Sequence, residues 1–207
     1  MESKLRIGVV LFDGFELLDV FGPLEFFLSE KRLFDSVMLA KASGRVESGQ
    51  GPVVFAEQSL SDCEEVDVLM IPGGMGTRRE IQNQILISEI FRLSKSARFV
   101  CSICTGSALL AKTGLLDGRK ATSNKAAWKW VTSQREEVRW IPKARWVQDG
   151  KFFTSSGVSA GMDMALALIA EIFDEAESRK IAEFAEYQWN SDPSWDPFAK
   201  IHGLSSD

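Results

Sequence analysis

The residue of this sequence best placed for nucleophilic chemistry is Cys104, which lies on a predicted tight turn. Residues 98–102 (RFVCS) predict a short buried strand, and residues 105–113 predict a helix directly after it. Gly106 follows Cys104 by two residues, the spacing of a nucleophile elbow with cysteine in place of serine. Such a turn presents the sulfur at the carboxyl end of a strand and at a helix N-terminus, where thiolate is favoured. The structural alternative is a buried, inert cysteine, because free cysteines often act as small apolar side chains.

The sequence offers few partners for this nucleophile. The one histidine, His202, lies in a C-terminal segment that we expect to be loosely ordered, so a Cys–His dyad is disfavoured. Asp19 lies in the apolar segment LLDVFGP, where a carboxylate is costly to bury unless it is hydrogen-bonded or protonated. A protonated Asp19 is a candidate proton donor to Cys104, and a helix cap or a solvent-facing acid is the structural alternative. Glu16 and Glu25 are predicted to be surface residues.

Two glycine-containing turns are candidates for the rest of a site. Gly73 and Gly74 end a predicted buried strand, and their backbone N–H groups are suited to an oxyanion hole. A simple strand-ending turn is the structural alternative for this pair. Gly157 and Val158 precede a predicted helix and are candidates for a pocket wall, with Ser159 as the N-cap of that helix.

Composition excludes several classes of partner. The chain of 207 residues has a net charge of −5 with scattered basic residues, which argues against nucleic-acid binding. The chain has one histidine, and its Cys101-x-x-Cys104 pair runs from a strand into a turn with no second pair, which argues against a metal site. The N-terminus lacks the apolar core of a signal peptide, and no apolar stretch reaches the roughly 18 residues that cross a membrane, so no membrane partner is expected. The odd set Cys63, Cys101 and Cys104 predicts a cytoplasmic protein, with Cys101 in the core and Cys63 unactivated.

Alternating strand and helix patterns predict one α/β domain, with a mostly parallel sheet covered by helices on both faces. Gly22 and Pro23 are expected to split or kink the first helix. Asp149 and Gly150 predict an added β-hairpin between residues 146–147 and 151–154. The other expected strands lie at residues 5–12, 36–42, 53–55, 66–71 and 98–102, and the expected helices at residues 16–29, 85–96, 105–113, 160–173 and 175–187.

Five ordered motifs resemble the ThiJ/PfpI superfamily, which has a class I glutamine-amidotransferase-like fold. The likeness extends from Ile7 to about Tyr187 and implies a flavodoxin-like three-layer sandwich as a single domain over residues 1–207. The motifs lie at residues 18–23 (LDVFGP), 71–74 (IPGG), 101–107 (CSICTGS), 114–122 (GLLDGRKAT) and 154–163 (TSSGVSAGMD).

Within the superfamily, Asp19 after leucine together with the segment ICTGS is most similar to the isonitrile (isocyanide) hydratase branch. This resemblance implies that Cys104 is the nucleophile, that Asp19 is its acidic partner and that Thr105 contributes to the pocket. It also implies a homodimer that uses no metal or organic cofactor and acts on a small molecule.

The sequence departs from the superfamily in two places. Asn124 stands where many relatives have a histidine, so this position can hydrogen-bond a ligand but cannot act as a base. Residues 189–207, rich in tryptophan, form a C-terminal extension or tail that has no assignable counterpart.

Three functions are compatible with these residues. The leading hypothesis is hydration of an isocyanide to an N-substituted formamide through a thioimidate on Cys104, because this chemistry needs no histidine. The second is a glyoxalase-like or deglycase-like reaction on 2-oxoaldehydes, against which Asn124 counts. The third is a redox or stress-responsive protein that senses oxidants by oxidation of Cys104.

Overall fold

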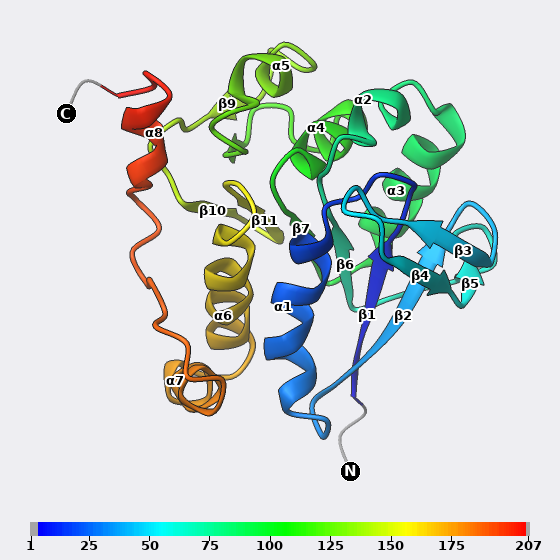
Figure 1. Ribbon diagram of the computed structural model, residues 1–207, viewed down its shortest axis with the longest axis horizontal. Helices are drawn as coiled ribbons and strands as arrows, with labels where there is room; N and C mark the ends of the chain where they lie inside the picture. The colour runs from blue at the N-terminus through cyan, green and yellow to red at the C-terminus, as the bar shows by residue number, and fades with distance from the viewer. Residues whose placement is uncertain (1–3, 206–207) are drawn as a thin grey trace.

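A seven-stranded sheet forms the centre of the computed structural model, which describes residues 4–205 (Figure 1). Its strand order is β10-β11-β7-β6-β1-β2-β5, and all neighbours are parallel except the hairpin pair β10 and β11. The strands are β1 (Leu5–Val10), β2 (Phe34–Ala40), β5 (Gln58–Ser59), β6 (Val68–Ile71), β7 (Phe99–Ser102), β10 (Trp146–Asp149) and β11 (Phe152–Ser155). The predicted mostly parallel sheet and the added hairpin are therefore confirmed.

The central strands are continuous apolar runs because both faces of the sheet are covered. Every residue of β6 is buried, and β1 pairs with both β6 and β2. In the register, Ser102 at the end of β7 faces Ile71 of β6 on one side and Thr154 of β11 on the other. Three parallel strands therefore end at one edge of the sheet, and the turns that follow them meet there.

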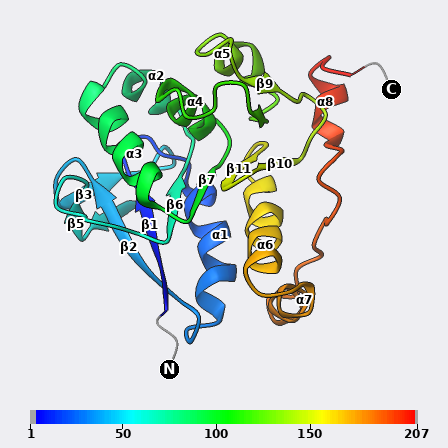
Figure 2. The ribbon, with the colours of Figure 1, turned by 180° about the vertical axis from the view of Figure 1, so that it is seen from behind.

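Helices cover both faces of the sheet, as predicted. Figures 1 and 2 show α1 (Leu17–Ser29) and α6 (Ala160–Ile172) over one face and α3 (Gln84–Ser96) and α4 (Gly106–Lys112) over the other. α7 (Glu175–Phe184) packs against α6. The short helices α2 (Thr77–Glu80) and α5 (Trp128–Thr132) lie near the edge where the strands end.

The first helix is not split at Gly22 and Pro23, which was one of the two expectations for this segment. α1 is one continuous helix that contains Pro23. A Cβ on Gly22 would lie 2.8 Å from the Met162 side chain of α6, so glycine lets the two helices approach closely at the predicted break. Packing against α6 therefore holds together a helix that local sequence alone would interrupt.

Small elements outside the sheet account for the other differences. The predicted strand at residues 53–55 exists as β4 (Val53–Ala56), but it pairs with the unpredicted β3 (Gly44–Glu47) in a separate antiparallel hairpin. β8 (Lys120–Ala121) and β9 (Arg139–Trp140) form a second two-stranded unit. These strands are too short for their periodicity to stand out in the sequence.

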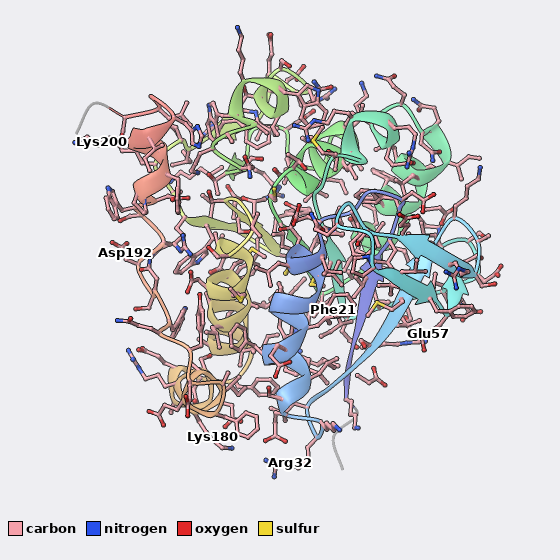
Figure 3. All side chains as sticks on the ribbon, viewed as in Figure 1. Phe21, Arg32, Glu57, Lys180, Asp192 and Lys200 are labelled. Atoms are coloured by element: carbon pink, nitrogen blue, oxygen red, sulfur yellow. The ribbon has the colours of Figure 1, made fainter. Side chains whose placement is uncertain are left out.

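The C-terminal segment returns to the site edge of the sheet. After α7 the chain runs back along the molecule to α8 (Pro197–Ile201), and backbone hydrogen bonds attach it at Lys143 and Arg145, just before β10 (Figures 1 and 2). Figure 3 shows Asp192 and Lys200 on the outer side of this segment. The expectation of a loosely ordered tail is wrong for its described part, residues 189–205, because backbone and side-chain hydrogen bonds attach it to the domain. No helix in residues 4–205 is long and apolar enough to cross a membrane.

Candidate functional site

The turn after β7 has the backbone of a nucleophile elbow. Cys104 adopts a φ of 57°, a left-handed conformation that is strained for a residue with a side chain. Its N–H donates to the Ser156 carbonyl at 3.2 Å, which ties the turn to the end of β11. A Cβ on Gly106 would lie 2.3 Å from the Ile71 carbonyl oxygen, so glycine is required where α4 begins. The local sequence thus builds the turn that its spacing predicts.

The Cys104 sulfur is buried, with 5% of the residue exposed, and lies among hydrogen-bond donors. Asn124 Nδ2 donates to Sγ at 3.2 Å, and the backbone N–H groups of Thr105 and Val158 also interact with it. Burial, followed by the charge of Asp19, nevertheless raises the pKa of the thiol to about 12. The expectation of a readily formed thiolate is therefore corrected: burial outweighs the hydrogen bonds from Thr105, Val158 and Asn124, and the surroundings favour the neutral thiol.

Asp19 lies on the first turn of α1 and is fully buried. Its Oδ2 accepts the N–H of Gly73 at 2.8 Å, while Oδ1 is buried without a hydrogen-bond partner. Burial raises its pKa well above the ordinary value of 3.8; the Gly73 hydrogen bond opposes this rise, and the charge of Glu16 adds to it. Asp19 also interacts with the Cys104 side chain. Burial therefore shifts this carboxyl group toward its protonated form, beside the thiol of Cys104.

Gly73 and Gly74 serve the site in a way that the sequence did not indicate. The Gly73 N–H donates to Asp19, and the Gly74 N–H donates to Thr105 Oγ1 at 3.0 Å. Thr77 Oγ1 also donates to Thr105 Oγ1, at 3.1 Å. The two N–H groups predicted for an oxyanion hole are thus engaged inside the fold, where they hold Asp19 and Thr105. The donors beside the sulfur come instead from Thr105, Val158 and Asn124.

Asn124 is fixed by its surroundings. Its Oδ1 accepts the Ala127 N–H at 2.9 Å, which turns Nδ2 toward Cys104. A Cβ on Gly157 would lie 2.3 Å from Nδ2, so a glycine beside the amide preserves its position. Val158 has a φ of 40°, and this second strained turn brings its N–H to the sulfur. The amide therefore has one orientation, with the donor on the sulfur.

Ser159 occupies the N-cap position of α6 as predicted, but its hydroxyl makes no capping bond. The hydroxyl instead accepts a long hydrogen bond of 3.4 Å from Arg145. Ser159 differs from the expected cap because its backbone is already helical, with φ −67° and ψ −23°, whereas a capping residue is normally extended.

An opening of about 260 Å³ leads to Cys104. Glu16, predicted to be a plain surface residue, is half-buried in its wall three residues before Asp19. The i, i+3 spacing of Glu16 and Asp19 was the sequence feature that could have placed Glu16 near the site. Met75 and Arg78 were missed because only the turn after β6 brings them to the opening. The lining residues are Glu16, Gly74, Met75, Arg78, Cys104, Thr105, Asn124, Ala126, Ala127 and Val158.

Within the described residues, the larger hollow and the other two cysteines lack this combination of groups. A larger hollow of about 530 Å³ near the ends of β1 and β2 is lined by Lys41, Arg45 and Arg79 among others, but contains no nucleophile. Cys101 lies in the middle of β7 in the core, as predicted, and Cys63 is buried, with its thiol 3.8 Å from the Glu65 carbonyl. Within residues 4–205, no cluster of three or more His, Cys, Asp or Glu side chains is arranged to hold a metal ion.

Comparisons with known proteins agree with this geometry. The DJ-1/PfpI family matches residues 5–171. An isonitrile hydratase from Pseudomonas putida is 33% identical over 169 residues, which cover 81% of this chain and 72% of the relative. A deglycase from Thermococcus kodakarensis is 27% identical over 158 residues, 73% of this chain and 89% of that protein.

Solved structures show the same fold. The crystal structure of a ThiJ/PfpI family protein from Pseudomonas syringae superimposes with a TM-score of 0.81 at 25% identity, covering 98% of this chain and 85% of that one. The family match spans the sheet, the elbow and most of α6, and it ends before α7. The chain belongs to the DJ-1/PfpI family.

Proposed function

We propose that this protein is a cysteine-dependent isonitrile hydratase, which adds water to a small isocyanide and releases an N-substituted formamide. The observation that carries the proposal is the fully buried Asp19, whose pKa burial raises, in contact with the buried thiol of Cys104. The similarity to an isonitrile hydratase over 81% of the chain supports it. The terminal carbon of an isocyanide must gain both a nucleophile and a proton, and this pair supplies both.

The first step joins the isocyanide to the enzyme. The Cys104 sulfur bonds to the terminal carbon while the Asp19 carboxylic acid delivers its proton to the same carbon. The thiol proton passes to the other oxygen of Asp19, so the carboxyl group ends the step protonated. The product is a thioimidate, R–N=CH–S–Cys, in which one C–S and one C–H bond have formed. No external base is needed, because each group gives one proton and Asp19 receives one.

The second step consumes water. Water adds to the thioimidate carbon, Asp19 takes a water proton and returns its own proton toward the nitrogen, and a tetrahedral R–NH–CH(OH)–S–Cys forms. Cleavage of the C–S bond releases R–NH–CHO, and the sulfur regains the hydroxyl proton. Thr105 N–H, Val158 N–H and the Asn124 amide stabilise negative charge on the sulfur as the bond forms and breaks.

The test is formamide production from para-nitrophenyl isocyanide by the wild-type protein, Cys104→Ala and Cys63→Ala. The proposal expects turnover by the wild type and Cys63→Ala and none by Cys104→Ala. Cys63 is the matched control because it is equally buried but lies away from the opening. Turnover by a folded Cys104→Ala protein, or no turnover by a folded wild type, overturns the proposal.

The same assay separates the two alternative functions. Deglycase-like chemistry draws support from the relative at 27% identity, and Cys104-dependent consumption of methylglyoxal without isocyanide turnover would favour it. Oxidant sensing needs an accessible thiolate, and the raised pKa and burial of Cys104 count against it. An intact-mass gain of oxygen on Cys104 after mild peroxide would favour sensing.

A further inference from the structure

A second compartment of about 250 Å³ adjoins the opening that leads to Cys104. Both spaces are lined by Asn124, Ala126 and Val158, so the compartment and the opening to Cys104 lie next to each other on the two sides of these residues. The compartment is also lined by Lys125, Ser156, Gly157, Ser159, Phe198 and His202.

The outer wall of this compartment comes from the C-terminal segment. Phe198 and His202 are four residues apart, so they lie on the same face of α8. Both fall beyond residue 171, where the family match ends. Cys104 therefore belongs to the part of the chain that matches the family, whereas the outer wall of the compartment comes from the C-terminal segment.

Hydrogen bonds to the domain hold this wall in place. Asp163 of α6 accepts from Tyr187 Oη at 3.0 Å and from the Asn190 N–H at 2.9 Å. The Asp196 N–H donates to the Lys143 carbonyl at 2.7 Å, and Asp196 Oδ1 caps α8 by accepting the Phe198 N–H at 3.0 Å. Phe198 is therefore held in a defined position, although 48% of it is exposed.

The chemistry of the lining favours a neutral aromatic group. The Lys125 ammonium already donates to Thr122 Oγ1 at 2.7 Å and to the Ser123 and Ala144 carbonyls at 3.2 and 2.7 Å. Its three protons are thus used within the protein and leave none for an anionic ligand. Phe198 offers an apolar ring, and aromatic pairs gain energy beyond simple burial.

The size of the compartment fits the same class of ligand. An apolar cavity of about 150 Å³ accommodates benzene. A space of about 250 Å³ therefore has room for a substituted six-membered ring.

From this arrangement we infer that the compartment binds an aryl substituent of the substrate and that Phe198 is a residue that determines specificity for aryl over small alkyl compounds. The inference rests on the proposed function for the identity of the reacting group. The binding of an aryl group beside Cys104 can be tested without that reaction.

The first experiment compares para-nitrophenyl isocyanide with methyl isocyanide in the wild type, Phe198→Ala and Ile201→Ala. Ile201 is the matched control because it lies on α8, is 70% exposed and does not line the compartment. Phe198→Ala should raise KM for the aryl substrate about tenfold, or about 1.4 kcal/mol. It should leave kcat, and KM for methyl isocyanide, within about twofold. An equal change for both substrates, or no change for the aryl one, overturns the inference.

The second experiment does not need turnover. Cys104 is alkylated with iodoacetamide and with iodoacetanilide, and mass spectrometry measures both rates at this residue. The ratio of the iodoacetanilide rate to the iodoacetamide rate should be higher for Cys104 than for glutathione, a free thiol used as the reference. This ratio should fall about tenfold in Phe198→Ala and stay unchanged in Ile201→Ala. If these ratios are found but no isocyanide is turned over, the proposed function is rejected and the inference that the compartment binds an aryl group is supported. A ratio unaffected by folded Phe198→Ala, checked by thermal unfolding, rejects the compartment.

Discussion

Cys101 and Cys104 lie three residues apart, and the difference between them shows what makes a buried cysteine useful. Both are almost fully buried, and burial raises the pKa of both thiols. Cys101 lies in the middle of β7, and burial alone accounts for its shift. Cys104 lies on a left-handed turn, with three donors and the Asp19 carboxyl group around it. The two cysteines are therefore alike in burial and differ in the polar groups around the sulfur.

The comparison indicates that the reactivity expected of Cys104 comes from the polar groups around its sulfur. Each donor becomes more favourable as negative charge develops on the Cys104 sulfur, in a place where water cannot screen it. Cys101 has no comparable donors to stabilise a thiolate. A resting thiol with a high pKa is compatible with catalysis when a proton acceptor and donor such as Asp19 adjoins it.

The largest expected contrast is between Cys104→Ala and Cys101→Ala. Isocyanide turnover should fall at least about 10⁴-fold in Cys104→Ala, because the nucleophile is lost. Cys101→Ala should keep its kcat but lose about 1–2 kcal/mol of unfolding free energy, since it leaves a small cavity in the core. Parallel steady-state kinetics and urea unfolding measure both effects. Loss of turnover in a stable Cys101→Ala protein would break the distinction between the two cysteines.

Asp19→Asn should lower kcat about 10³-fold, because the amide cannot exchange protons with the substrate. The amide oxygen can still accept the Gly73 N–H, so the turn after β6 should persist. Alkylation of Cys104 by iodoacetamide should stay within about twofold of the wild-type rate, because the amide is as neutral as the protonated acid that it replaces. Slower alkylation together with slower turnover would indicate a distorted site instead of a lost proton donor.

The pH dependence of stability gives an independent test of the proton on Asp19. Because its folded-state pKa lies above 3.8, the folded protein holds this proton more tightly than the unfolded chain. The free energy of unfolding should therefore fall as pH rises from about 3.8 to the folded pKa of Asp19. Subtracting the Asp19→Asn profile from the wild-type profile isolates this slope. A flat difference would show that Asp19 is ionised in the folded protein.

Replacing Asn124 alters the surroundings of the sulfur without touching Cys104. Asn124→Asp keeps the acceptor for the Ala127 N–H but replaces the donor to the sulfur with a carboxylate oxygen. The kcat of Asn124→Asp should fall about 100-fold. The kcat of Asn124→Ala should fall less, because this change removes the donor without adding a charge. Rates for the two variants at one pH test this order. A more active Asn124→Asp would show that the donor does not act on the sulfur.

The smallest effect is expected from Gly157→Ala. The new Cβ would lie 2.3 Å from Asn124 Nδ2 and must displace the amide, so kcat should fall about tenfold. Gly49→Ala is the control, because its Cβ would meet its nearest neighbour at an ordinary 3.6 Å. Wild-type kinetics in Gly157→Ala would show that the site tolerates movement of Asn124.

Local sequence predicted the parts of the fold that depend on local properties. The apolar run 66–71 indicated a buried strand, and the small residues after Cys104 indicated the elbow. Both features depend on residues that are close together in the sequence. The predicted split of the first helix at Pro23 was wrong, because packing of α1 on α6 outweighs a local propensity. The hairpin of β3 and β4 was missed in part, since strands this short carry little periodicity.

The sequence by itself determined the turn that carries Cys104, the acid in an apolar segment and the family to which the chain is similar. Tertiary structure alone decided which N–H groups face the sulfur, that burial raises the pKa of both Cys104 and Asp19, and that α8 lies beside the site. The reason is physical: a pKa and a hydrogen bond depend on burial and on partners from distant segments, here from β6, β11 and the turn before α5. A turn needs only its own residues, whereas a reactive site needs all the elements that surround it.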